Sequence, residues 1–117
     1  GLLNRNIMAL ERVLTTAVSG LKANAKKAQV SATNIVNQNT AGYKAVQVQT
    51  VSRNAGTFAG SNGKGSGVVA ELVAGSQAVD VALEFTRLIE AEAAYKANAA
   101  VIRTSEEIQR KAVNLIA

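Results

Sequence analysis

Apolar positions recur at spacings of three and four residues over two long segments, one at each end of the chain. The first segment runs from about Asn6 to Gln38, with apolar positions at Leu10, Leu14, Val18, Leu21, Ala25, Ala28, Ala32 and Ile35. This spacing marks one face of a helix, and from Val18 onward it alternates as in a coiled-coil heptad. The pattern predicts a long helix with an Ala-rich seam. Gly20 within it indicates either close approach by a neighbour or a tolerated weak spot.

The second segment predicts a helix that Ser76 or Asp80 caps and that ends near Ile116. Its stripe consists of Val81, Phe85, Leu88, Ala91 or Glu92, Tyr95, Ala99, Ile102, Ser105, Ile108, Ala112 and Leu115. A helix of about 38 residues is on the order of 57 Å long. A compact chain of this size has a radius of gyration of only about 13 Å. The two helices therefore predict a rod.

Turn-forming residues mark the end of the first helix. They are Asn37, Asn39, Thr40 and Gly42. Their side chains compete for backbone hydrogen bonds, and glycine readily adopts a positive φ. We expect the helix to end near Gln38 and Gly42 to take a positive φ.

A short hairpin is predicted between the helices. Apolar or β-branched residues alternate with glutamines over Ala45–Val51, which is a strand pattern, and Val68–Val73 can form its partner. Residues 54–67 are rich in Gly and Ser and predict a flexible loop.

Composition limits what the chain can bury. Its 117 residues are 48% hydrophobic, but much of this is Ala, and aromatic residues make up only 3%. Burial stabilises by roughly 25 cal/mol per Å² of apolar surface, so small side chains build a thin core. With no Cys there are no disulfides to compensate, and oligomerisation is a remedy that small proteins use.

The net charge of +5 is unevenly distributed. Residues 1–44 carry +5, residues 45–75 carry +1 and residues 76–117 carry −1. A basic helix beside a slightly acidic one favours pairing or packing between subunits over a stripe that binds nucleic acid. No apolar run is long enough to cross a membrane, and no secretory signal pattern is present. Residues 1–7, before Met8, are interpreted as a leader or as added residues.

Candidate chemistry is sparse, and we expect no catalytic residue, no cofactor and no metal. The chain has neither His nor Cys, which removes the commonest zinc ligands and every His-dependent catalytic triad. Lys64 among the glycines at 63–67 does not follow the phosphate-loop pattern. The acidic residues of the second helix, Glu84 among them, are interpreted as a salt-bridged face.

Two blocks of sequence resemble the flagellar axial proteins, the family of rod and hook subunits. The first contains Ser19-Gly20-Leu21 and then Asn34-Ile35-Val36-Asn37, Asn39-Thr40 and Gly42-Tyr43-Lys44. The second contains Val79-Asp80-Val81-Ala82, Glu84-Phe85, Leu88-Ile89, Ala94-Tyr95-Lys96-Ala97-Asn98 and Val101-Ile102-Arg103-Thr104. The departures are Val36, where the family usually has Ala, Ala28, where a larger apolar residue is common, and Glu92-Ala93, where Gln-Arg is usual.

The resemblance implies a mainly α fold, in which two long antiparallel terminal helices form a coiled coil and a short β-hairpin and loop are inserted between them in the chain. The core domain would comprise residues 8–44 and 76–117, and the insertion residues 45–75. The implied role is a structural, non-enzymatic subunit of the bacterial flagellar rod, in the periplasm, or of the hook, outside the cell. It would polymerise into a helical tube with copies of itself and other axial proteins, after passage through the flagellar type III export apparatus.

The residues that we expect at assembly contacts are Leu21, Asn34, Ile35, Asn37, Asn39, Thr40, Gly42, Tyr43, Phe85, Leu88, Tyr95, Asn98 and Ile102. Two alternatives stay open. One is a small basic helical protein that binds nucleic acid or an anionic surface. The net charge of +5 supports this alternative. The other is a dimeric coiled-coil adaptor.

Overall fold

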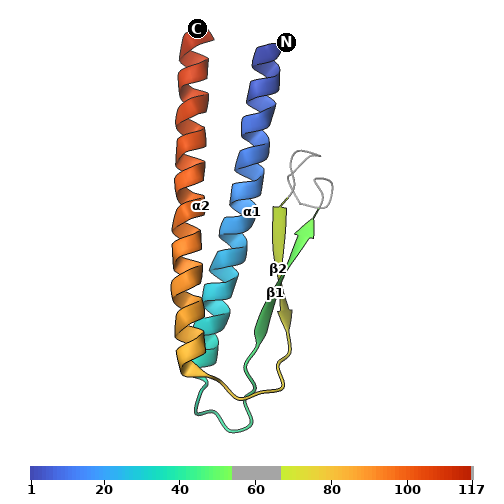
Figure 1. Cartoon of the computed structure of the whole chain (residues 1–117), viewed down its shortest axis with the longest axis vertical. Helices are drawn as coiled ribbons and strands as arrows, with labels where there is room; N and C mark the ends of the chain where they lie inside the picture. Colours follow the sequence, from blue (N-terminus) through green and yellow to red (C-terminus); the bar gives the residue numbers. More distant parts are fainter. Residues whose placement is uncertain (54–66, 117) are drawn as a thin grey trace.

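Two long helices lie side by side and antiparallel, so that both chain termini are at one end of the molecule (Figure 1). The computed structural model describes residues 1–53 and 67–116, in the order α1 (Leu2–Val36), β1 (Gln47–Arg53), β2 (Gly67–Val73) and α2 (Val81–Ile116). The molecule measures 62 × 25 × 15 Å, with a radius of gyration of 18.0 Å. The predicted mainly α rod with a short hairpin is therefore confirmed.

Helix α1 begins at Leu2, earlier than predicted, and includes the residues interpreted as a leader. No Gly or Pro interrupts the chain from Leu2 to Asn6, so the helix propagates through it. It ends at Val36, where the Asn37 amide side chain donates to Thr33 O at 2.9 Å. Helix α2 begins after Asp80 rather than Ser76, because Asp80 Oδ1 accepts from the Leu83 backbone amide at 3.1 Å.

The hairpin is antiparallel, with Gln47 opposite Val73 and Arg53 opposite Gly67. Strand β1 begins two residues later than predicted, because the backbone of Val46 is bound to Asn34 of α1 instead of to β2. The predicted Gly-rich loop lies outside the described residues apart from Gly67, which belongs to β2.

The hairpin packs mainly on α1, on the side away from α2 (Figure 1). Ser19 Oγ accepts a hydrogen bond from the Val68 amide of β2 at 3.1 Å. Ala23 and Val30 follow Ser19 on the same helix face and are buried. One face of α1 is thus covered within the chain.

The centre of the α1–α2 contact is lined by small and polar side chains. On α2 these residues recur every seven positions, at Glu84, Ala91, Asn98 and Ser105. On α1 they include Ala17, Gly20 and Ser31, and Ala17 and Ser31 are buried. Gly20 belongs here because a Cβ on it would lie 2.9 Å from Asn98 Oδ1, which supports the close-approach interpretation, with the neighbour inside the chain.

The predicted seams are wrong in part. Ala91 and Ser105 of the predicted α2 stripe are buried, as expected, but other members of both seams are not. Val18, Ala25 and Ala32 of α1 are exposed, as is Phe85 of α2. Seam members such as Leu21 lie half-buried at the margin of the contact. Small residues at the centre allow close helix approach, and this displaces the larger apolar side chains to the side of the pair.

Candidate assembly surface and the buried polar cluster

A buried polar cluster closes the molecule at the end opposite the termini. Its centre is Asn34, near the end of α1, which is 0% exposed. Asn34 Nδ2 donates to Val46 O at 2.8 Å and to Glu84 Oε2 at 3.1 Å. Asn34 Oδ1 accepts from the Val46 amide at 2.9 Å and from the Tyr43 hydroxyl at 2.8 Å. These four bonds use the full donor and acceptor capacity of one carboxamide.

Glu84 is the charged member of this cluster and is 1% exposed. It forms a salt bridge, as predicted, but its carboxylate is buried. Burying a carboxylate is costly unless it is paired and hydrogen-bonded. Glu84 Oε1 pairs with Arg87 NH1 at 2.9 Å, and Oε2 accepts from Asn34. No buried polar side-chain atom within residues 1–53 and 67–116 lacks a partner. The cluster therefore ties α1, the turn, the start of β1 and α2 together.

The turn residues predicted at assembly contacts lie around this cluster. Gly42 has φ +74°, which confirms the predicted positive φ. Asn37 Oδ1 accepts from the Thr40 hydroxyl at 3.1 Å, while Asn39 and Thr40 are exposed. A contact between these side chains and another subunit stays a prediction.

Close packing at Gly75 was missed by the sequence analysis. A Cβ at this position would lie 1.7 Å from the carbonyl oxygen of Ala45. Nearby, the Ala45 amide donates to Gln77 O at 2.9 Å. Gly75 stands in a run that is otherwise typical of a loop, so only the crossing of two distant segments reveals why glycine is needed.

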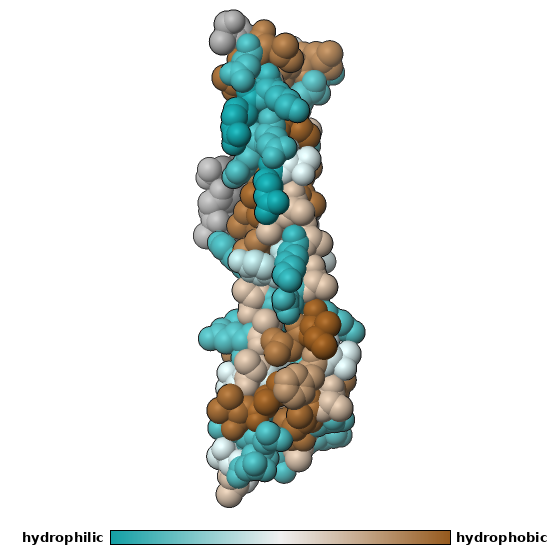
Figure 2. All heavy atoms as spheres, turned by 90° about the vertical axis from the view of Figure 1, so that its left-hand side faces the viewer, coloured by the Kyte–Doolittle hydropathy of each residue, from teal (hydrophilic) through white to brown (hydrophobic). Residues whose placement is uncertain are grey.

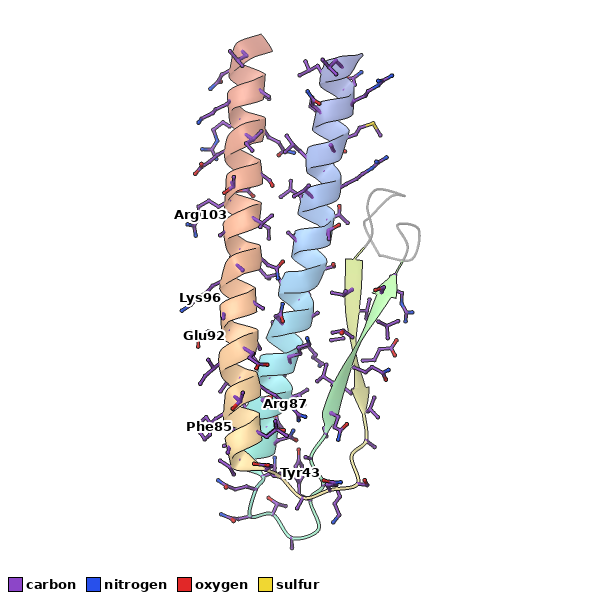
Figure 3. The ribbon with its side chains drawn as sticks, in the orientation of Figure 1. Tyr43, Phe85, Arg87, Glu92, Lys96 and Arg103 are labelled. Carbon is purple, nitrogen blue, oxygen red and sulfur yellow. The ribbon has the colours of Figure 1, made fainter. Side chains whose placement is uncertain are left out.

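Large apolar side chains are exposed along α2. Phe85 is 49% exposed, Ile89 66% and Tyr95 40%. Figure 3 shows Phe85, Glu92, Lys96 and Arg103 pointing away from α1. Figure 2 shows that apolar groups gather on the lower half of this side, while hydrophilic groups form a band above them.

The remaining predicted assembly residues fall into two groups. Leu21, Ile35, Leu88 and Ile102 are half-buried beside the α1–α2 contact. Asn98 is half-buried within that contact and Asn34 fully buried in the cluster, so both have partners in their own chain. The exposed and half-buried apolar residues remain candidates for contact with a neighbour.

A groove of about 350 Å³ lies between α1, the start of β1 and α2. Val30, Val48 and Ala94 form part of its lining, and Lys27 and Glu90 are among its charged residues. The described residues contain no cluster of three acidic side chains that could hold a metal ion. In the same part of the chain, no helix combines the length and the apolar character needed to cross a membrane.

Residues 76–115 match the family model described as the flagellar basal body rod FlgEFG protein C-terminal. This part of the chain is similar to the C-terminal region of the flagellar rod proteins. None of the curated proteins matches the chain. The matched region comprises nearly all of α2, including Glu84, Phe85 and Asn98, and the predicted resemblance to the flagellar axial proteins is thereby confirmed.

The match supports a structural role in the flagellum. The family consists of structural flagellar components rather than enzymes. The matched helix α2 has one face that packs on α1 through small and polar residues and another that exposes Phe85 and Ile89.

Proposed function

We propose that this protein is a structural subunit of the flagellar rod or hook that polymerises into a helical tube through α1 and α2. The observation that carries this proposal is an exposed apolar side on a long axial helix pair. Phe85, Ile89 and Val18 all lie outside the contact that holds the pair together. Burying a side chain of this size contributes about 1.5–3 kcal/mol.

Assembly would complete the folding of the helix pair. The centre of the α1–α2 contact buries mainly Ala17, Ala91 and polar groups, which provide little apolar area. Neighbouring subunits would supply the missing apolar contacts at Leu21, Ile35, Phe85, Leu88, Tyr95 and Ile102. A repeated contact that does not close on itself generates a helical assembly.

The proposed partners are further copies of this chain and other flagellar axial proteins. We also propose passage through the flagellar type III export apparatus in an unfolded state. The chain has no cysteine, and within the part that the structure describes the buried apolar residues are three alanines and one valine. Such a chain is suited to passage in an unfolded state.

The proposal is tested by expressing an epitope-tagged chain in its flagellated host and purifying hook–basal bodies. We expect the tagged chain in the rod or hook fraction, and loss of swimming when the chain is deleted. A chain that stays in the cytoplasm while flagella form normally would contradict the proposal. Salt-dependent retention on nucleic acid would then support the basic-protein alternative.

A further inference from the structure

Asn98 of α2 lies on Gly20 of α1 and makes the first specific contact between the two helices. Asn98 Nδ2 donates to Ala94 O of its own helix at 3.0 Å, which holds the side chain in place. A Cβ on Gly20 would lie 2.9 Å from Asn98 Oδ1, so the amide group occupies the space that a side chain at position 20 would need. This contact therefore requires the glycine and the asparagine to lie at the same level of the helix pair.

Asn34 of α1 and Glu84 of α2 make the second specific contact, close to the turn. Asn34 Nδ2 donates to Glu84 Oε2 at 3.1 Å, and both side chains are fully buried. If α2 slid along α1, the Glu84 carboxylate would lose this bond, and burying a carboxylate is costly unless it is hydrogen-bonded. The second contact thus also fixes the level of one helix against the other.

The two contacts are equally spaced on both helices. Asn34 follows Gly20 by fourteen residues, and Asn98 follows Glu84 by fourteen. Fourteen residues are two heptads, or about 21 Å of helix. Because the helices are antiparallel (Figure 1), both contacts form in one register, and any displacement of α2 along α1 breaks both of them.

Side-chain size alone does not select this register. The line of small and polar residues on α2 repeats every seven positions, through Glu84, Ala91, Asn98 and Ser105. If α2 moved by one heptad, about 10.5 Å, Gly20 would meet Ala91 or Ser105, and both are smaller than asparagine. In coiled coils, a single polar residue at the helix interface specifies the register at a cost in stability.

We propose that Asn98 and Glu84 determine the register of α1 and α2, and that without them the pair also adopts registers displaced by one heptad. This inference concerns the single chain and goes beyond the proposed function. A displaced register would move Phe85 and the rest of the exposed apolar side of α2 by about 10.5 Å along α1. The two polar residues thereby set the shape that the chain presents to any neighbour.

Disulfide trapping measures the register, because the chain has no cysteine of its own. Ala94→Cys is combined, in the purified dilute chain, with a cysteine at one of three α1 positions seven residues apart, namely Ala17, Asn24 or Ser31. Asn24 and Ala94 line the same groove, and each lies four residues from its side of the Gly20–Asn98 contact. A disulfide needs Cα atoms within about 7 Å, so a displacement of one heptad separates the three pairs. We expect the unaltered register to give the 24–94 disulfide alone.

The same cysteine pairs are then placed in a chain with Glu84→Ala and Asn98→Ala. We expect a smaller share of the 24–94 disulfide and the appearance of the 17–94 and 31–94 disulfides. Moving the asparagine should choose the direction of the displacement. Ala91→Asn, added to the two alanine substitutions, should favour the 17–94 disulfide, and Ser105→Asn should favour the 31–94 disulfide.

The matched control is a chain with Glu106→Ala and Asn114→Ala, two exposed positions of α2, and it should give the 24–94 disulfide alone. Circular dichroism checks that each variant keeps its helices. If the double variant loses them, Asn98→Ala with Ala91→Asn, which keeps Glu84, decides by the same products.

Two results would overturn the inference. Helical variants that give only the 24–94 disulfide, wherever the asparagine stands, would show that the connection through Gly75 fixes the register without these side chains. An unaltered chain that forms the 17–94 or 31–94 disulfide as readily as the 24–94 disulfide would show that the two contacts select no register. Neither result bears on whether the chain enters the flagellum, so the proposed function is tested separately.

Discussion

The polar cluster and the open apolar side of α2 differ most at two adjacent residues. Glu84 is 1% exposed and bound to Asn34 and Arg87, whereas Phe85 is 49% exposed. The charged residue is thus inside and the aromatic residue outside, the reverse of the usual preference. The difference indicates that the polar cluster sets the shape of a single chain, whereas the apolar side is available to a neighbour.

The largest effect on the single chain is expected for Asn34→Asp. The new side chain keeps the shape of asparagine but cannot donate to Val46 O, and it places a second carboxylate beside Glu84. Removing one partner from a buried charged network lowers the unfolding free energy by about 3–5 kcal/mol. Chemical denaturation measures this loss, and Asn39→Asp, at an exposed site, is the control. Equal stability of the two variants would show that the cluster does not hold the chain together.

Gly75→Ala should destabilise the same end of the molecule by a slightly smaller amount. The added Cβ would overlap the Ala45 carbonyl, so the two backbone segments must separate, at a cost of about 3 kcal/mol. Ser76→Ala is the neighbouring control, since Ser76 is exposed. A thermal unfolding midpoint unchanged in Gly75→Ala would mean that these segments do not cross closely.

Gly42→Val should have a more modest effect on stability. The positive φ at this residue strains a β-branched side chain by about 1–2 kcal/mol, although the surrounding space is open. Gly42→Asn is the control, because asparagine tolerates this conformation. We expect the valine variant to lower the unfolding free energy and to reduce swimming, and the asparagine variant to do neither. Normal swimming of the valine variant would show that this turn is not needed for assembly.

Phe85→Ala should barely change the single chain, by less than about 1 kcal/mol, since half of the side chain is exposed. Its effect on assembly should be large, about 2 kcal/mol or more than tenfold in association, as for an aromatic anchor in an interface. The measurement compares protein secreted into the medium with protein in basal bodies. The exposed residue Thr104 provides the control variant, Thr104→Ala. If the Phe85→Ala variant enters basal bodies at the level of the wild-type chain, Phe85 does not belong to the assembly surface.

The smallest effect concerns the helix ends far from the polar cluster. Leu2 is 74% exposed and Leu115 88%, so little packing holds either end in dilute solution. We expect helicity measured by circular dichroism to rise with protein concentration as neighbours order these turns. Helicity that stays constant down to nanomolar protein would show that the single chain is already fully ordered.

The pattern of neighbouring residues was sufficient to predict the secondary-structure elements, as the hairpin and Gly42 illustrate. Alternation over Val46, Val48 and Thr50 predicted a strand, and turn chemistry predicted the positive φ. Local pattern could not predict that Asn34 would bind the Val46 backbone and delay the start of β1, because this bond joins residues twelve positions apart. The close packing of Gly75 on Ala45 was unpredictable for the same reason.

The sequence by itself determined two long helices, a rod and a resemblance to flagellar axial proteins, because helical periodicity, chain length and local motifs are written in consecutive residues. Only the tertiary structure decided which face of each helix is buried. Apolar periodicity placed Phe85 and Val18 in the seams, yet Glu84 and Ala17 are the buried residues. A rotation of one residue, about 100°, separates these alternatives. It is fixed by the fit of Gly20 against Asn98 and by the bonds of Asn34, which exist only when distant segments meet.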